Sequence, residues 1–433
     1  MASSAPPSDP VMRRNFYHLY ADIAGFGVLS GSTLAFIAIY MARLGASSWQ
    51  IGLLTAGPAL VNLVFALPAG QWLAERPLTT TVFWTSIGQR LLYPLLVPLC
   101  LWLPATWQNP LILALVVLTS IPGTALAIGF NALFAEAVPE AWRGEVVGRR
   151  NALLALTVLV STLGCGQLLR VLPFTTGYAV VFAIGAAGAL YSSYHLARVR
   201  LQQPLPRRQW RGAPLGVGGR SGRPLTPDAP LNRGLALRVL ISNRLARGRA
   251  MLAPLHTAFG PFFWALFSFH TAQYVPIPLF PLFWVREIRL GDAAISVLNA
   301  VFYALMLVAS LRLGSLTVRF GNRRLVVAGA FFLALYPLLT ALSRGIGLLL
   351  AASVLGGVVW AILGGALANR LLERIPTDDR PPYLALYNLA LNGAMLIGSL
   401  GGTTIADAIG LREALFVATG LRLVAALLLW RCG

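Results

Sequence analysis

The chain has 433 residues, of which 57% are hydrophobic and only 11% are charged, and its mean hydropathy is +0.72. A globular domain carries about 25% charged residues, so this composition excludes a soluble protein and indicates a membrane protein. The 34 basic residues outnumber the 14 acidic ones and give a net charge of +20. Every basic residue is arginine, and lysine does not occur.

The lack of lysine excludes several classes of protein. A P-loop requires a lysine that reaches the β- and γ-phosphates, and a retinal or pyridoxal Schiff base forms on a lysine amine. We therefore exclude a self-contained P-loop pump, a rhodopsin and a Schiff-base enzyme. Cys100, Cys165 and Cys432 are odd in number and far apart, so we expect no disulfide framework, no metal site and no cofactor.

Twelve stretches of the sequence are long and apolar enough to cross a membrane as helices, for which about 20 residues are needed. They cover residues 16–42, 51–73, 80–103, 110–135, 151–169, 174–197, 259–285, 293–313, 325–343, 346–369, 383–406 and 410–430. The pattern predicts an all-α polytopic membrane protein with about twelve transmembrane helices.

Arginine is distributed unequally between the two ends of these spans. With the N-terminus inside the cell, most arginines fall on the cytoplasmic side, Arg149 and Arg150 among them, and six fall outside: Arg43, Arg170, Arg286, Arg289, Arg344 and Arg412. Because basic loops stay in the cytoplasm, we expect a multi-pass protein of the cytoplasmic membrane with both termini inside. This placement explains the net charge without a nucleic-acid partner.

A long basic loop divides the spans six and six. We expect a polar N-terminal tail at 1–14, a six-helix bundle at 15–198, a basic cytoplasmic linker at 199–257 and a second six-helix bundle at 258–433. In the linker, Leu237, Leu240, Ile241 and Leu245 have helical spacing and alternate with arginines. This pattern predicts an amphipathic helix on the anionic lipids of the inner leaflet, and a solvated charged linker is the alternative.

The two halves are related in sequence. A shift of 237 residues aligns Glu136 with Glu373, Pro139 with Pro376, Arg143 with Arg380 and Asn151 with Asn388. The tripeptide Arg-Leu-Gly also occurs at 43–45 and again at 289–291, between the first two spans of each half. Corresponding loops carry corresponding residues, which predicts two bundles related by a parallel repeat.

The loop between the eighth and ninth spans, residues 314–324, is called the gate loop below. It contains Gly314, Arg319, Gly321, Arg323 and Arg324. The first four match the pattern G-x-x-x-D-R-x-G-R-R of the major facilitator superfamily (MFS) of secondary transporters, with Val318 in place of the acid and Asn322 in place of one arginine. The corresponding loop of the first half keeps only its glycine and a shifted acid-arginine pair at residues 70–77.

The sequence resembles this family over nearly its whole length. The resemblance implies that the gate loop latches a cytoplasmic gate, that spans 1, 4, 7 and 10 line a central cavity, and that the two halves rock around it. The family's antiporter pattern in span 5 is not met, because that span reads Gly164-Cys165-Gly166-Gln167. The alternative for the clustered arginines is that they only set the topology of the chain.

Asp22 is the only acidic residue well inside a predicted span. Ionisable groups within the membrane are costly and mark functional sites, and a carboxyl group shielded from water can bind and release a proton near neutral pH. Asp22 is therefore our first candidate for proton coupling. The alternative is an acid that stabilises a helix N-terminus near the lipid headgroups.

Arg90 and Arg422 lie near the centres of the third and twelfth spans. Two arginines against one aspartate would suit an anionic substrate. The resemblance to the family places both spans at the periphery, so we expect these arginines to pair with amides and hydroxyls or to extend toward the membrane surface.

The seventh span, PFFWALFSFHTAQYVPIPLFPLFW, is rich in aromatic residues. Phe267, His270 and Tyr274 share one face and Gln273 is adjacent, while three prolines follow and predict a break in the helix. An aromatic wall with few polar groups is typical of a site for amphipathic molecules. The alternative is aromatic packing against lipid around a hydrogen-bonded histidine.

His270 is a second candidate for proton coupling, because imidazole titrates near physiological pH. Asn131 and Asn388 are further candidates for the substrate cavity. Neither asparagine distinguishes contact with a substrate from a hydrogen bond between helices.

Taken together, these features predict a monomeric secondary transporter of small molecules that works by alternating access and is driven most simply by protons. Export of amphipathic compounds is the preferred direction, and uptake or exchange of organic anions or sugar-like solutes is the alternative. A transporter-like receptor that moves nothing is the alternative of another class. The motifs H-E-x-x-H and G-x-S-x-G do not occur, so we do not expect an enzyme.

Overall fold

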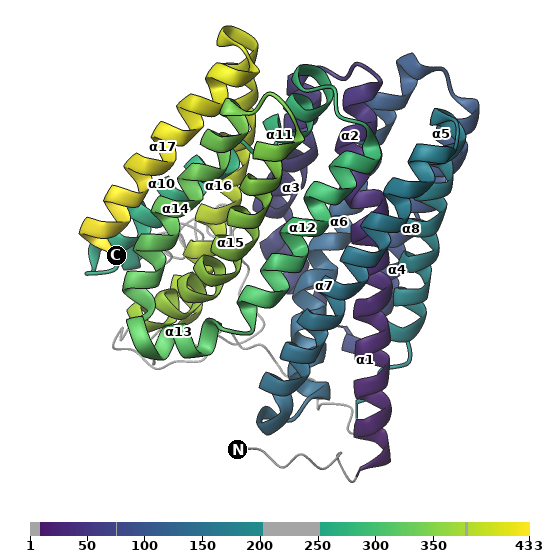
Figure 1. Ribbon diagram of the computed structural model, residues 1–433. Coiled ribbons are helices and arrows are strands. Elements are labelled where there is room, and N and C mark those ends of the chain that lie inside the picture. The colour runs from purple at the N-terminus through teal and green to yellow at the C-terminus, as the bar shows by residue number, and fades with distance from the viewer. Residues whose placement is uncertain (1–8, 75, 202–251, 377–379) are drawn as a thin grey trace, which may run out of the picture.

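The computed structural model describes residues 9–74, 76–201, 252–376 and 380–433 (Figure 1). Within these ranges the chain is almost entirely helical and has no strand. The amphipathic helix expected around residues 237–249 lies outside them. The helices form two bundles of six membrane crossings each, which confirms the predicted fold class.

The first bundle begins with a crossing built from three joined helical pieces. Its helices are α1 (Pro10–Leu29), a π-helical turn (Ser30–Leu34), α2 (Ala35–Arg43), α3 (Ser48–Ala74), α4 (Leu78–Arg90), a 3₁₀ turn (Tyr93–Leu95), α5 (Leu96–Trp102), α6 (Ala105–Ala137), α7 (Glu140–Val171) and α8 (Phe174–Leu196). Prolines 104, 139 and 173 directly precede α6, α7 and α8. At these positions the missing N–H costs no helical hydrogen bond.

The second bundle repeats this plan. Its elements are a 3₁₀ turn (Ala253–His256), α10 (Gly260–Tyr274), α11 (Leu279–Leu282), a π-helical turn (Phe283–Glu287), α12 (Asp292–Ser310), α13 (Leu313–Phe320), α14 (Asn322–Leu342), α15 (Ile346–Arg374), α16 (Arg380–Ile409) and α17 (Leu411–Cys432). The short helix α13 carries most of the gate loop and joins the eighth crossing to the ninth.

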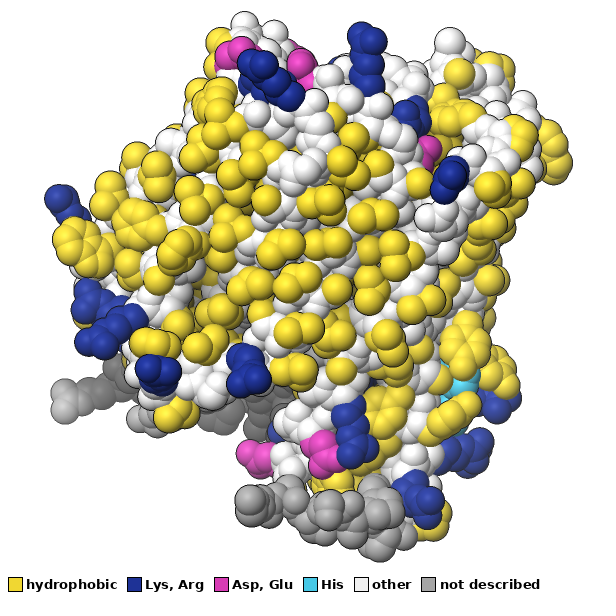
Figure 2. Space-filling view, viewed as in Figure 1, with side chains coloured by type: hydrophobic (Ala, Val, Ile, Leu, Met, Phe, Trp, Pro, Cys, Tyr) yellow, Lys and Arg dark blue, Asp and Glu magenta, His cyan; other side chains and the backbone are white. Residues whose placement is uncertain are grey.

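Ten of these crossings are continuous helices, long and apolar enough to span a membrane. The other two, the third and the seventh, are interrupted near Pro94 and between Pro276 and Pro278. Figure 2 shows hydrophobic side chains over the middle of the visible face, with charged side chains gathered at its ends. An apolar surface of this kind is what the hydrocarbon core of a bilayer solvates.

The two bundles meet along two helix pairs, α3 with α16 and α7 with α12. Glycine permits the approach in each pair: a Cβ at Gly52 would lie 3.0 Å from the Thr403 side chain, and a Cβ at Gly166 would overlap Ser296. Both positions lie toward the end of the molecule away from Pro10 and Cys432. We call this the closed end, and the opposite end the terminal end.

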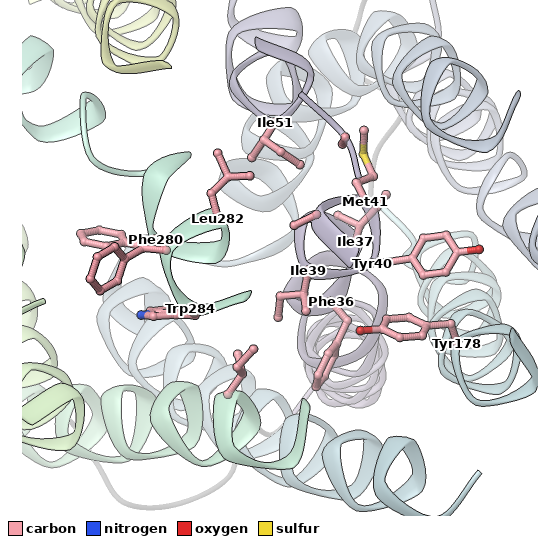
Figure 3. Close-up of a cluster of buried hydrophobic side chains, with 14 of the residues drawn as sticks. Phe36, Ile37, Ile39, Tyr40, Met41, Ile51, Tyr178, Phe280, Leu282 and Trp284 are labelled. Carbon is pink, nitrogen blue, oxygen red and sulfur yellow. The ribbon is translucent and has the colours of Figure 1, made fainter. Parts of the chain in front are cut away.

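A hydrophobic cluster seals the closed end (Figure 3). It joins Phe36, Tyr40 and Ile51 of the first bundle to Leu282 and Trp284 of the second, and all five are at most 7% exposed. The two other clusters each belong to a single bundle. Apolar burial therefore holds the bundles together at the closed end.

Candidate functional sites

Asp22 lies in a buried polar cluster inside the first bundle. Its carboxylate is 3.7 Å from the Arg90 guanidinium of α4 and 3.4 Å from that of Arg150 on α7, and it accepts a hydrogen bond from the Ser192 hydroxyl of α8. Asp22, Arg90 and Arg150 are 3%, 5% and 7% exposed. Through this carboxylate α1 is tied to three other helices.

Arg90 makes further hydrogen bonds on the same side of the cluster. It donates to the Ser86 hydroxyl at 3.0 Å and to the Ser193 hydroxyl at 3.2 Å, and these two hydroxyls are 2.6 Å apart. The sequence favoured partners such as hydroxyls but not the contact with Asp22. Arg90 reaches Asp22 because α4 and α1 both pack on α8, and the sequence gives no direct sign of this packing.

The structure places Arg150 inside the bundle, whereas the sequence assigned it to a cytoplasmic loop. The helix α7 begins at Glu140, so Arg150 lies within it and not before it. Its guanidinium donates to the Leu19 carbonyl at 3.2 Å and lies 4.6 Å from the Phe130 ring centre. A carboxylate, a carbonyl and an aromatic face replace the water that this cation loses.

A pair of histidines packs between α1 and α8. His18 Nδ1 lies 2.9 Å from His195 Nδ1, and the residues are 4% and 5% exposed. The rings of Tyr17, Tyr191 and Tyr194 surround His195. Sequence reasoning missed this pair, although the four-residue spacing of His18 and Asp22 on one helical face was visible.

The seventh crossing breaks as its prolines predict: α10 ends at Tyr274 and α11 begins at Leu279. His270 and Gln273 are buried, and His270 Nε2 lies 3.1 Å from the Tyr387 hydroxyl of α16. Phe267 and Tyr274 are half-buried. The structure thus separates the four candidates into a buried polar pair and two aromatic rings that are partly accessible.

Arg422 of α17 binds two backbone carbonyls that lack a helical hydrogen-bond partner. It donates to Leu333 O at 2.8 Å and to Gln273 O at 3.0 Å. Leu333 O has lost its helical partner because residue 337, four positions on, is a proline without an N–H. Gln273 O precedes the break in the seventh crossing. Arg422 therefore supplies donors that the backbone lacks.

The asparagine candidates lie on α6 and α16. Asn131 is exposed on α6, and Asn388 is exposed on α16 and donates to Leu384 O of its own helix. Asn62 of α3 instead contacts Asn392 of α16 at 3.2 Å, which links the two bundles. Asn62 and Asn392 therefore form the polar bridge between the bundles, while Asn131 and Asn388 take no part in it.

The gate loop binds its own bundle. Gly321 has φ 77°, a backbone conformation that favours glycine. Asn322 donates to Glu373 of α15 at 2.6 Å, and Arg323 donates to Trp430 O of α17 at 3.1 Å. Gly314 lies in α13, the Arg319 guanidinium lies 5.2 Å from the Phe320 ring centre, and Arg324 is exposed. Glu373 therefore supplies to this loop an acid that the pattern has lost at Val318.

At the closed end the repeated Arg-Leu-Gly corners of the two bundles meet. Arg43 Nε lies 2.7 Å from the Asp292 carboxylate, and Arg43 Nη2 donates to Leu290 O at 2.7 Å. In return, Arg286 of the second bundle donates to Ala46 O of the first. These contacts add a polar rim to the apolar seal.

Comparison with known proteins gives a family match over the second bundle. The family model of the Major Facilitator Superfamily matches residues 262–432. Multidrug resistance protein 2 of Bacillus subtilis (strain 168) is 25% identical over 150 residues, which make up 35% of this chain and 37% of that protein. The match thus spans little more than a third of that relative.

Solved structures share the fold over the whole chain. A D-xylose-proton symporter has a TM-score of 0.67 at 14% identity, and the alignment covers 97% of each chain. A bacterial homologue of the iron transporter ferroportin, in an inward-facing state, has a TM-score of 0.66 at 13% identity and covers 99% of each chain.

Twelve crossings in two repeated bundles, with charged groups buried inside each bundle, define a polytopic membrane protein. The family match and the shared fold confirm the resemblance found in the sequence. Residues 262–432 match the family model of the Major Facilitator Superfamily, and the chain as a whole shares the fold of the D-xylose-proton symporter.

Proposed function

We propose that the protein is a proton-coupled secondary transporter whose structure is closed toward the outside of the cell. The basic terminal end then faces the cytoplasm, as the unequal distribution of arginine favours. The apolar seal and the Arg43–Asp292 ion pair form the closed outer gate. Alternating access requires this end to open while the terminal end closes.

The observation that carries proton coupling is the position of Asp22 between Arg90 and Arg150. The cluster has one negative and two positive charges, so a proton on Asp22 leaves two buried guanidinium groups without a carboxylate. An uncompensated buried charge costs about 3–5 kcal/mol. Proton binding therefore favours a conformation in which these helices separate or rehydrate.

The cluster is connected to the interface between the bundles through α7. Arg150 lies on α7, which packs on α12 of the second bundle. A change in the contact between Asp22 and Arg150 is thus transmitted to one of the two helix pairs that hold the bundles together. This connection links the proton to alternating access without requiring the proton and the substrate to share a site.

For the substrate, we propose small amphipathic compounds that are exported. Phe267 and Tyr274 offer partly accessible aromatic faces next to the break in the seventh crossing. The name of the relative from Bacillus subtilis, Multidrug resistance protein 2, agrees with such a cargo. His270 remains the second coupling candidate, with its contact to Tyr387 as the bond that protonation would change.

The test uses inverted membrane vesicles. In these vesicles an exporter concentrates an amphipathic dye such as ethidium in the lumen when the lumen is acidified. The wild type should accumulate the dye with the pH gradient, and Asp22→Asn should abolish this gradient dependence. Asp407→Asn, which changes an exposed aspartate at the end of α16, is the matched control. Unchanged gradient dependence in Asp22→Asn would remove Asp22 from the mechanism.

Because Asp22→Asn leaves two arginines unpaired, a second variant separates coupling from folding. Asp22→Asn with Arg90→Gln keeps the cluster at the wild-type charge of +1. If coupling requires the carboxylate, this double variant folds and binds dye but still fails to use the gradient. Recovery of gradient-driven transport would contradict the proposal.

A second candidate function is transport of organic anions. In the part of the chain that the structure describes, three arginines and one aspartate are buried inside the bundles, which leaves an excess of positive charge. Competition in the same vesicles by an organic anion or a pentose, but not by dyes, would favour this function over dye export. Ligand binding without flux in liposomes would instead favour a transporter-like receptor.

A further inference from the structure

Ionisable groups line the contact between α1 and α8 from the terminal end inward. On α1, Arg14, His18 and Asp22 are each four residues apart and therefore lie on one face. On α8 and just beyond it, Ser192, His195 and Arg198 are each three residues apart. Exposed Arg14 and Arg198 mark the water-facing end of this line, and buried Asp22 and Ser192 mark its inner end.

The two imidazoles in the middle of the line lie within hydrogen-bonding distance of each other. With Nδ1 of His18 and Nδ1 of His195 at 2.9 Å, one nitrogen donates and the other accepts. Each ring is nearly inaccessible to water, and His18 Nε2 has no partner among the described residues. A pair of this kind binds an additional proton and spreads the charge over two rings.

We propose that His18 and His195 form a proton-binding pair that carries protons between the aqueous phase at the terminal end and Asp22. This inference rests on the proposed coupling at Asp22 and adds the route by which the carboxylate gains and loses its proton. Asp22 lies one helical turn inward from His18 and within electrostatic range of His195. Its hydrogen-bond partner Ser192 lies one turn from His195 on α8.

The charges around the pair favour transfer of a bound proton toward Asp22 over its retention on the two rings. Arg14 and Arg198 repel a proton held on the rings, and Asp22 attracts it. The remaining ionisable groups at the pair are the hydroxyls of Tyr17, Tyr191 and Tyr194. Arg90 from α4 and Arg150 from α7 act on the pair through Asp22.

The transfer is balanced in protons and charge. A proton from the water at the terminal end binds the neutral pair and gives it a charge of +1. The pair then passes one proton to Asp22, which changes from carboxylate to neutral carboxyl while the pair returns to its neutral form. The cluster of Asp22, Arg90 and Arg150 rises from +1 to +2, and this is the state that destabilises its packing.

The first test measures proton-driven dye transport in His18→Gln and His195→Gln, with vesicles clamped at pH values between about 5 and 9. Each variant should lose roughly tenfold or more in the rate driven by protons and should lose the pH dependence of the wild-type rate. Dye binding at equilibrium should be unchanged. His256→Gln is the matched control, because His256 is exposed at the terminal end.

The outcomes distinguish this inference from the proposed function. If Asp22→Asn abolishes the gradient dependence but both histidine variants keep the wild-type pH profile, the relay is wrong and the coupling at Asp22 stands. If Asp22→Asn itself leaves the gradient dependence intact, the coupling fails and the route to Asp22 fails with it.

A second test needs no transport. The chain has four histidines, so protein labelled with ¹⁵N-histidine in lipid nanodiscs gives a small set of imidazole signals that single substitutions assign. The signals of His18 and His195 should titrate together, and His195→Gln should change the titration of His18. Independent titration of the two rings would overturn the proposal even if the variants transport poorly.

Discussion

Each bundle compensates the desolvation of its buried arginines in a different way. In the first bundle Arg90 and Arg150 share the carboxylate of Asp22. In the second, Arg422 has no carboxylate within ion-pair distance among the described residues and binds two backbone carbonyls without helical partners, one in α14 and one near the end of α10. Protonation of Asp22 can change the first arrangement, because it removes the carboxylate that the two arginines share. The second has no group that titrates near neutral pH, so we assign it a structural role.

The role of Arg422 predicts energetic coupling with Pro337. Arg422→Ala should leave Leu333 O and Gln273 O without donors and destabilise the protein by about 2–6 kcal/mol, since each unsatisfied buried acceptor costs about 1–3 kcal/mol. Pro337→Ala restores the N–H that Leu333 O lacks. Arg422→Ala should therefore cost about 1–3 kcal/mol less in the Pro337→Ala background, as measured by thermal or denaturant unfolding in detergent.

Pro110→Ala provides the control for this cycle, because Pro110 lies in α6, away from Arg422. The effects of Arg422→Ala and Pro110→Ala should add. Equal cost of Arg422→Ala with and without Pro337 would show that Arg422 does not replace the missing backbone donor.

The sequence identified four of the ionisable residues inside the bundles but not their partners. Asp22, Arg90, Arg422 and His270 follow from their positions in apolar stretches. Asp22 meets residues 68, 128 and 170 positions away, and such contacts depend on how each helix is rotated. The helices are apolar on nearly all sides, so the periodicity that fixes rotation in a soluble helix is weak here.

At the scale of elements, the interrupted seventh crossing bears more directly on the opening of the closed end than the continuous crossings do. The seventh crossing divides at Tyr274, and its second part supplies Leu282 and Trp284 to the seal at the closed end. Glycine lets α16 contact this break directly, because a Cβ at Gly398 would lie 3.0 Å from Tyr274 Cβ. The outer part of the crossing can therefore move with the gate while Arg422 holds the inner part.

The Arg43–Asp292 ion pair predicts a measurable bias toward the closed outer gate. Its side chains are 24% and 12% exposed, so solvent weakens the pair and we assign it about 1 kcal/mol. Arg43→Ala should then raise the rate at which an impermeant maleimide labels Ile51→Cys, a buried position in the seal, about fivefold. The measurement uses a protein without its three native cysteines.

Two further variants make this test specific. Exchanging the charges, with Arg43→Asp and Asp292→Arg together, should return labelling toward the wild-type rate. Arg170→Ala should leave it unchanged, because Arg170 is exposed in the last turn of α7. Equal labelling in all variants would mean that the apolar seal alone sets the gate.

The prolines of the seventh crossing allowed its break to be predicted from the sequence, and the span count was correct. The start of α7 was not, because Glu140, Arg143, Glu145 and Arg149 read as a charged loop although they form the first turns of a long helix. Charged turns of a helix that extend beyond the hydrocarbon resemble a loop in composition. The same ambiguity placed Arg150 outside the bundle.

At the scale of the whole molecule, the repeat detected in the sequence appears as two bundles whose corresponding corners touch. The Arg-Leu-Gly corners face each other at the closed end, and the gate loop binds α15 and α17 of its own bundle. Among the described residues, the polar contacts between bundles thus lie at the closed end and at the Asn62–Asn392 bridge. This distribution suits a molecule that rocks about its middle.

Alternating access can be measured without knowing the substrate. Spin labels at Thr176→Cys and Arg344→Cys report the separation of the bundles at the closed end, and labels at Ala141→Cys and Leu372→Cys report it at the terminal end; all four positions are exposed. Between about pH 5 and 9, pulsed electron–electron double resonance should show two populations of the distance between labels at each end. The closed-end distance should lengthen as the terminal-end distance shortens, and Asp22→Asn should abolish the pH response. A single unchanging distance at both ends would contradict a transporter and favour a receptor.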